Sequence, residues 1–332
     1  MTEQTHKPMV SVVMSIYNEP LQWLEPAVES ILKQTYSSFE FIIVCDNPEY
    51  TEGITYIKKA AAEDCRIRFI INENNLGPTK SFNRAISYAR GKYIARMDAD
   101  DISLPERFER QVDYLETHPE ISVCASDAHT MDENGKVTRK NRYKKKRNQA
   151  LNIIANSIAH PSVMFRKSLM ELRTPIYNED FTYSQDYELW LFLLLNGHRF
   201  HTLESPLLLY RKSRRQISAT KKRRQVELFK KAHRKLITDW LTRYGIIEDT
   251  DAGDLRIMLK KASKAYRNVR HEDQEYLLMI IYVLYFSLGT DSWAYRFKYL
   301  ADRNMPALHI RFIYTFRLFV SRKTRRDRTG FN

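Results

Sequence analysis

Three aspartates within four positions are the feature of this sequence that most clearly suggests chemistry. Asp98, Asp100 and Asp101 directly follow the mostly apolar run 93–97, which has the pattern of a buried strand. Carboxylates this close repel one another unless a cation lies among them, so the spacing favours a divalent metal held by Asp98 and Asp100. The alternative is a solvated acidic turn leading into a helix at Pro105, with Asp101 or Ser103 as its cap.

Apolar runs alternate with helical spacings on both sides of these aspartates. The predicted strands are 9–16, 39–45, 66–72, 93–97 and 121–125, and the predicted helices are 21–34, 53–64, 79–90 and 105–117. This alternation is typical of right-handed βαβ units around a parallel sheet. We therefore predict an α/β domain over residues 1–216, with a mostly parallel, Rossmann-like central sheet flanked by helices.

Polar residues follow three of these strands. Tyr17-Asn18-Glu19 come after the first strand, Asp46 after the second, and the aspartates after the fourth. Because ligands bind beyond the carboxyl ends of strands in such sheets, this edge is predicted to bind a nucleotide. Asp46 either accepts hydrogen bonds from a base or ribose or caps a turn before Pro48. Neither common Gly-rich phosphate loop is present, so a metal and basic side chains must neutralise phosphate.

The overall charge indicates an anionic partner. Lys and Arg number 54 and Asp and Glu 40, which gives a net charge of +14. This excess fits nucleic acid, nucleotide phosphates or an acidic membrane surface. The 332 residues are 43% hydrophobic, as in globular proteins. Three scattered cysteines predict reduced thiols in the cytosol, and neither a signal-peptide core nor an apolar run of about 18 residues is evident.

An ordered set of short motifs resembles the family 2 glycosyltransferases of bacterial surface-polysaccharide synthesis. The motifs are SVVMSIYNE at 11–19, SILKQTY at 30–36, FEFIIV at 39–44, NLG at 75–77, GKYIARMDADD at 91–101, HPSVMFR at 160–166, QDYELW at 185–190 and Tyr210-Arg211. They cover roughly residues 9–216, in the family's order. The resemblance implies a GT-A fold, an inverting mechanism, a nucleotide-sugar donor, most simply a UDP-linked one, and Mn²⁺ or Mg²⁺ as cofactor.

The resemblance also implies roles for single residues. The loop 15–19 would hold uridine and ribose, Asp46 the uracil, and Asp98 and Asp100 the metal as the ends of a DXD motif; Asp186 would be the catalytic base. The set expected to bind the donor or its metal comprises Ser15, Tyr17, Asn18, Glu19, Asp46, Lys80, Asn83, Asp98, Ala99, Asp100, His160 and Arg211. The chain departs from the family pattern at 47–49, where Asn-Pro-Glu replaces Asp-Gly-Ser, so the base contacts stay open.

The chemistry explains why carboxylates are needed at two places. Departure of a nucleoside diphosphate leaves growing negative charge, which a metal on Asp100 and Asp98 would stabilise. The attacking acceptor hydroxyl must lose its proton to a base on the opposite face. Asp186, at the start of the helical pattern 186–195, suits this role, and Glu188 is the second candidate. The alternative is that Asp186 only begins that helix.

Two further residues each have two possible interpretations. His160 either contacts the acceptor or the diphosphate, or is a hydrogen-bonded structural residue. Arg211 either neutralises phosphate or belongs to a solvated basic turn.

Residues 217–332 are predicted to form a basic helical region. The expected helices are 221–244, 254–269, 273–288, 292–303 and 306–320. Residues 308–328 combine an apolar face with a polybasic end, which suits an anionic inner-membrane surface; a bundle or a homo-oligomer face is the alternative. A glycan or lipid-linked glycan acceptor would fit a cytoplasmic enzyme peripheral to the inner face of the bacterial membrane.

A competing hypothesis is a basic nucleic-acid-binding protein with a doubly wound domain. The sequence lacks the spacings of RRM, KH or zinc-finger modules, so nucleic acid is not the expected partner. A catalytically dead membrane scaffold is a third hypothesis, and the intact Asp98, Asp100 and Asp186 argue against it.

Overall fold

The structure is a computed structural model that describes residues 8–139, 158–214, 216, 220–251, 254–266 and single positions between 268 and 284. The chain divides into two compact units, Met1–Val283 and Leu284–Asn332, and nearly all described residues belong to the first. The helices predicted at 292–303 and 306–320 and the polybasic stretch 308–328 lie outside the described residues, as does most of 273–288. The domain boundary predicted after residue 216 stays a prediction.

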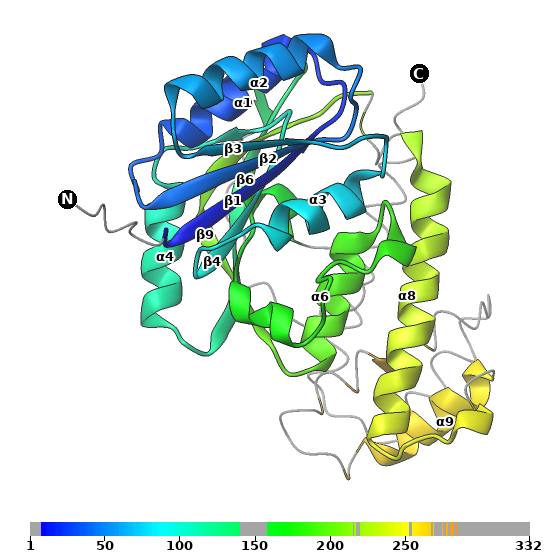
Figure 1. Cartoon of the computed structure of the whole chain (residues 1–332). Helices are drawn as coiled ribbons and strands as arrows, with labels where there is room; N and C mark the ends of the chain where they lie inside the picture. Colours follow the sequence, from blue (N-terminus) through cyan, green and yellow to red (C-terminus); the bar gives the residue numbers. More distant parts are fainter. Residues whose placement is uncertain are drawn as a thin grey trace. The chain divides into compact units, whose positions relative to one another are not determined.

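Among the described residues, nine strands form one mixed sheet (Figure 1). They are β1 (Val10–Ile16), β2 (Phe39–Cys45), β3 (Ile67–Ile71), β4 (Tyr93–Asp98), β5 (Ile102–Ser103), β6 (Ile121–Met131), β7 (Val137–Arg139), β8 (Met164–Arg166) and β9 (Arg199–Arg211). Their order is β3-β2-β1-β4-β8-β6-β9-β5, with β7 paired to β6. The predicted α/β class is therefore confirmed.

The first four strands are the parallel part of the sheet. β1 pairs in parallel with β2 and β4, and β2 pairs in parallel with β3. These strands are apolar along nearly their whole length because helices cover both faces. Beyond β4 the sheet is mixed: β8 enters antiparallel between β4 and β6, whereas β6 and β9 are parallel.

Helices cover the sheet on both sides. The α-helices of the described residues are α1 (Leu21–Leu32), α2 (Thr51–Glu63), α3 (Pro78–Ser87), α4 (Arg107–Thr117), α6 (Gln185–Leu195), α8 (Lys222–Arg243) and α9 (Leu255–Ala265). In Figure 1, α1 and α2 lie on one side of the sheet and α3 on the other. Right-handed crossovers require this, because the chain moves from β1 to β3 in one direction and returns past β1 to β4.

Two helices connect the sheet to the C-terminal part of the first unit. Helix α6 is buried along most of its length, and the ring of its Tyr187 stacks on Phe229 of α8 at 3.7 Å between centroids. The Tyr187 hydroxyl also forms a hydrogen bond with His233 of α8. Helices α8 and α9 confirm the predicted helical extension as far as it is described. In the part of the chain that the structure describes, no helix is both long and apolar enough to cross a membrane.

Candidate active site

The sheet register brings four polar segments to one edge. Ser15 in β1 is the direct neighbour of Asp98 in β4. On the other side of β1, Ile16 pairs with Cys45, and Cys45 pairs with Ile71. The residues that follow these strand ends, including the predicted donor-binding loop 17–19 and Asp46, therefore share the carboxyl edge of the sheet. The sequence predicted this juxtaposition.

Carboxylates dominate this edge next to β4. Oxygen atoms of Asp98, Asp100 and Asp101 all lie within 4.8 Å of one another. Burial, together with the charges of Asp98 and Glu19, raises the pKa of Asp100 to about 7. Burial likewise raises the pKa of Glu19, with Asp98 adding to the effect. The edge therefore carries more negative charge than its surroundings balance, as expected where a cation belongs.

The donor set fits a hard divalent cation. Asp98 and Asp100 are both partly exposed, and carboxylate oxygens are what Mg²⁺ and Mn²⁺ prefer when phosphate oxygens complete the shell. Asp101 differs, because it is fully buried and accepts the backbone N–H of Arg211 at 2.7 Å. Its place is within the protein, which leaves Asp98 and Asp100 as the two candidate ligands.

Metal binding should depend on pH through Asp100. Because its pKa is raised to about 7, the metal-free carboxyl binds a proton below that pH, and a metal must displace the proton. We expect the apparent Kd for Mn²⁺ to rise by about tenfold per pH unit below pH 7 and to level off above it. A titration that follows free Mn²⁺ by electron paramagnetic resonance measures this slope. An unchanged Kd between about pH 8 and pH 6 would contradict the assignment.

Arg96 is a central residue of the site that the sequence analysis missed. It is only 6% exposed, and its guanidinium pairs with Asp98 at 2.6 Å. The same group lies over the ring of Phe82, 4.6 Å from its centroid. Among the described residues, its Nε and Nη1 have no hydrogen-bond partner. An arginine two positions before an acidic motif could have been a signal, because both side chains then point to the same face of the strand.

A buried polar cluster surrounds Arg96. The hydroxyl of Tyr177 and Nε2 of His160 are hydrogen-bonded at 2.7 Å. Burial and the nearby Arg96 lower the pKa of His160 well below its usual value, so the imidazole is neutral. Asn83 holds Tyr177 in place by donating to its carbonyl at 2.8 Å and accepting its N–H at 3.1 Å. His160 and Asn83 therefore both form hydrogen bonds within the protein beside the site, and Tyr177 was not predicted at all.

Asp186 acts electrostatically on the same cluster. Burial alone would lower the pKa of Arg96, but the charges of Asp98 and Asp186 help to raise it. The pKa of Tyr177 is raised by burial and also by these two aspartates. Asp186 lies in the first turn of α6, and the buried face of that helix anchors it. The charges at the carboxyl end of β4 and at the start of α6 thus both act on the buried Arg96 and Tyr177.

Glu188, the second candidate base, already forms an ion pair with Arg173. Both carboxylate oxygens of Glu188 accept from the guanidinium of Arg173, at 2.7 and 2.8 Å. The Glu188 side chain is almost completely buried, and Arg173 also donates to the carbonyl of Ile176. A bidentate pair of this kind fixes the loop before α6 and favours Asp186 over Glu188 as the base.

Asp46 braces the turn that leads into α3. Its carboxylate accepts the side-chain amide of Asn72 at 2.7 Å and the backbone N–H groups of Leu76 and Gly77 at 2.8 and 2.9 Å. Gly77 has φ +86°, a left-handed conformation that glycine adopts without strain. A hydrogen bond from Asp46 to a nucleobase would be an addition to these three contacts.

Arg211 stabilises the acidic loop through hydrogen bonds to backbone carbonyls. Its guanidinium donates to the carbonyl of Asp100 at 2.7 Å and to the carbonyls of Asp132 and Glu133 at 3.1 Å. It is also buried and lies over the ring of Trp23. The hydrogen bonds of its guanidinium are therefore to backbone carbonyls, and the one to Asp100 positions that residue.

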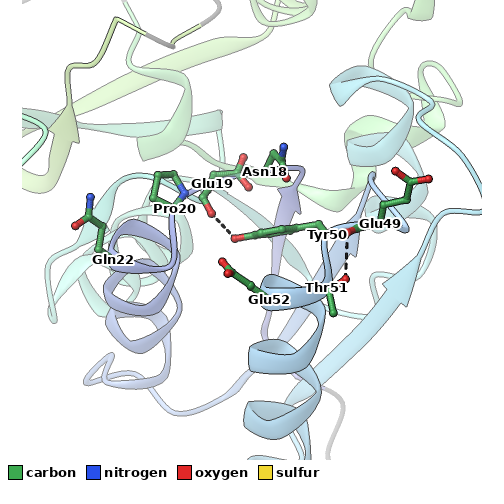
Figure 2. A pocket seen from close by; sticks show the side chains of 8 residues that line it. All are labelled: Asn18, Glu19, Pro20, Gln22, Glu49, Tyr50, Thr51 and Glu52. Atoms are coloured by element: carbon green, nitrogen blue, oxygen red, sulfur yellow. Dashed lines mark hydrogen bonds between the residues drawn. The ribbon is translucent and has the colours of Figure 1, made fainter.

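A hollow of about 690 Å³ opens where the loops after β1 and β2 meet (Figure 2). It is lined by Asn18, Glu19, Pro20, Gln22, Glu49, Tyr50, Thr51 and Glu52. The hydroxyl of Tyr50 donates to the carbonyl of Glu19 and ties the two loops together. The carboxylates of Glu19, Glu49 and Glu52 make this hollow suited to hydroxyl donors rather than to phosphate. Tyr17 and Lys80 are exposed at the same edge.

The comparisons with known proteins agree with this geometry. The model of the family "Glycosyl transferase family 2" matches residues 11–173. An uncharacterised glycosyltransferase of Methanocaldococcus jannaschii is 41% identical over 214 residues, which cover 64% of this chain and 73% of that protein. The chain belongs to glycosyl transferase family 2. This membership gives no support to the alternative of a nucleic-acid-binding protein.

Other relatives of this family 2 glycosyltransferase act in polysaccharide synthesis according to their names. The amylovoran biosynthesis glycosyltransferase of Erwinia amylovora is 34% identical, with 60% of this chain and 75% of that protein covered. The O-antigen biosynthesis glycosyltransferase of Escherichia coli is 32% identical, with 61% and 79% covered. The S. aureus TarS 1-349 structure in complex with UDP has a TM-score of 0.54 at 16% identity, covering 85% of this chain and 92% of that one. The expected GT-A fold is confirmed.

In this family 2 glycosyltransferase, the predicted site residues fall into two groups. Those that share the open carboxyl edge are Ser15, Tyr17, Asn18, Glu19, Lys80, Asp98, Ala99 and Asp100, although Ala99 itself is buried. Those whose polar atoms contact the protein itself are Asp46, Asn83, His160 and Arg211. Their predicted ligand contacts, like the base role of Asp186, stay predictions.

Proposed function

We propose that this family 2 glycosyltransferase moves a sugar from a UDP-linked donor to an acceptor hydroxyl in bacterial surface-polysaccharide synthesis, with inversion at the anomeric carbon. The observation that carries the proposal is the cluster of Asp98, Asp100 and Asp101 at the carboxyl edge of the sheet, where Asp98 is also paired with the buried Arg96. This cluster supports a donor end at Asp98 and Asp100, and the electrostatic effect of Asp186 on the same Arg96 supports a base near it.

The donor half of the proposal assigns the nucleotide to the edge beyond β1 and β2. The hollow beside Asn18 and Glu19 offers carboxylate and amide acceptors for the ribose hydroxyls. Tyr17, 46% exposed, presents a ring on which a base can stack. Solved structures of the same fold support a UDP-linked donor, since S. aureus TarS 1-349 was solved in complex with UDP and with UDP-GlcNAc.

In the proposed reaction, an acceptor oxygen attacks the anomeric carbon while the bond between this carbon and the diphosphate oxygen breaks. Mn²⁺ or Mg²⁺ held by Asp98 and Asp100 would supply the positive charge that stabilises the departing diphosphate. Asp186 takes the proton from the attacking hydroxyl, opposite the leaving group, which gives inversion. Arg96 fixes the direction of Asp98, and Arg211 holds the carbonyl of Asp100, so both ligands are oriented in advance.

For the acceptor, we propose a glycan carried on a lipid, with the enzyme peripheral to the inner face of the membrane. The named polysaccharide relatives and the excess of basic residues support this part of the proposal.

A thermal-shift screen tests the donor half. UDP-sugars with Mn²⁺ should raise the melting temperature by several degrees at concentrations near 100 times Kd, because a ligand at that level adds about 2.7 kcal/mol of stability. The same sugars as free monosaccharides provide the control and should have no effect. If no nucleotide sugar shifts the transition in the presence of Mn²⁺, the donor assignment is wrong.

A further inference from the structure

Helix α8 carries six cationic side chains on one face. Their spacing along the helix places them in a single stripe: Arg223, Arg224, Lys230, Lys231, Arg234 and Lys235. All six are exposed, and the 22-residue helix is about 33 Å long. Glu227 is the one acid within this stripe, and it is shared by Arg223 at 3.5 Å and Arg224 at 3.2 Å. With six cations against one acid, the stripe has a net positive charge; one of the cations, Lys231, also lies 5.2 Å from the centroid of the Phe181 ring.

The opposite face of α8 holds the segment that precedes and includes Asp186. Gln225 donates to the carbonyl of Tyr183 at 2.9 Å, and Phe229 stacks on Tyr187. Tyr183 has φ +77°, a strained conformation for a residue with a side chain, and it persists because its surroundings fix it. The outer face of α8 is thus on the far side of this helix from Tyr183 and Tyr187, which flank the proposed base in sequence.

We propose that the basic face of α8 docks the enzyme on an anionic phospholipid surface, so that a lipid-linked acceptor meets Asp186 from that surface. This inference rests on the proposed function and adds to it the place of docking. Exposed cations spread along one side of a long helix can face a flat anionic surface together, which complements the charge better than a compact ligand would. Each Lys or Arg near such a surface contributes on its own, and the contributions add up.

Vesicle flotation of the full chain tests the docking face. Wild type should float with phosphatidylcholine vesicles that contain about 30 mol% phosphatidylglycerol, should not float with phosphatidylcholine alone, and should be released by about 0.5 M salt. The variant Arg223→Gln/Lys230→Gln/Lys235→Gln should partition roughly a hundredfold more weakly. Wild-type-like binding by this variant would overturn the proposal.

A charge-matched variant provides the control. Lys33→Gln/Lys58→Gln/Lys59→Gln removes three exposed cations, one directly after α1 and two in α2. Its Lys33 forms an i,i+4 pair with Glu29, as Arg223 does with Glu227. This variant should lose less than about threefold in partitioning. Equal losses in both variants would show that only net charge matters and would overturn the assignment to α8. If the chain binds short duplex DNA and does not bind the vesicles, the partner of the basic face is nucleic acid, which would also overturn the proposal.

The two proposals fail in different ways. The α8 variant should keep the wild-type melting temperature and the wild-type thermal shift with UDP-GlcNAc and Mn²⁺, because its substitutions lie on the exposed face. A wild-type chain that floats with anionic vesicles but responds to no nucleotide sugar would refute the proposed donor and not the docking face. A chain that responds to nucleotide sugars but never floats would refute the docking face alone.

Discussion

Replacing Asp186 by Asn should lower the rate of sugar transfer by roughly 10³-fold and leave the affinity for the nucleotide nearly unchanged. Asn has almost the shape of Asp, so α6 should begin at the same place, but the amide cannot take a proton from the acceptor. Loss of the negative charge should also remove one of the influences that raise the pKa of Arg96. Steady-state kinetics on the transfer reaction and a UDP titration measure the two effects separately.

Asp180→Asn is the matched control for this experiment. Asp180 is an exposed carboxylate six positions before Asp186 in the same segment, so its removal tests a general loss of negative charge there. We expect a rate change of less than about threefold. Turnover close to wild type in Asp186→Asn, or an equal loss in both variants, would exclude Asp186 as the base.

Removal of divalent metal should also lower the rate of sugar transfer by roughly 10³-fold. Excess EDTA leaves Asp98 and Asp100 with no cation to balance the departing diphosphate, and Mn²⁺ or Mg²⁺ should restore the rate. Asp100→Asn should bind Mn²⁺ at least about a hundredfold more weakly, because one of two charged ligands is lost. Metal binding, measured by titration, is a readout that does not depend on finding the acceptor.

An exposed carboxylate far from the acidic motif serves as the comparison here. Asp113→Asn changes a side chain on the solvent face of α4 and should leave both metal affinity and rate within about twofold of wild type. Full activity of the wild type in excess EDTA would show that this enzyme neutralises the diphosphate without a metal.

The first four strands were predictable because each is a mostly apolar run that ends at polar residues. Phe39–Cys45 was predicted to the residue, and Val10–Ile16 and Ile67–Ile71 differ from their predictions by one residue at an end or both. The three-residue strand Met164–Arg166 was missed, since nothing in a short apolar run separates a strand from a buried loop. Its antiparallel entry is why the sheet becomes mixed beyond β4.

Site residues that directly follow a strand end were predictable. Site residues whose positions depend on tertiary contacts were less so. Asp98 and Asp100 belong to the first kind. Arg96 was overlooked because it lies within an apolar run and its partners come from segments distant in sequence. Tyr177 belongs to no periodic pattern, and Asn83 determines its position from 94 residues away. No local spacing could indicate that contact.

The pairing of β8 has a consequence for any shortened form of the protein. β4 lies between β1 and β8, so both of its edges are bonded only after residues 164–166 have joined the sheet. A fragment that ends after β6 would leave the backbone of β4 open next to its acidic motif, and open strand edges recruit other chains. The smallest piece worth expressing for studies of donor binding therefore extends past Arg166, well beyond the last residue of the acidic motif itself.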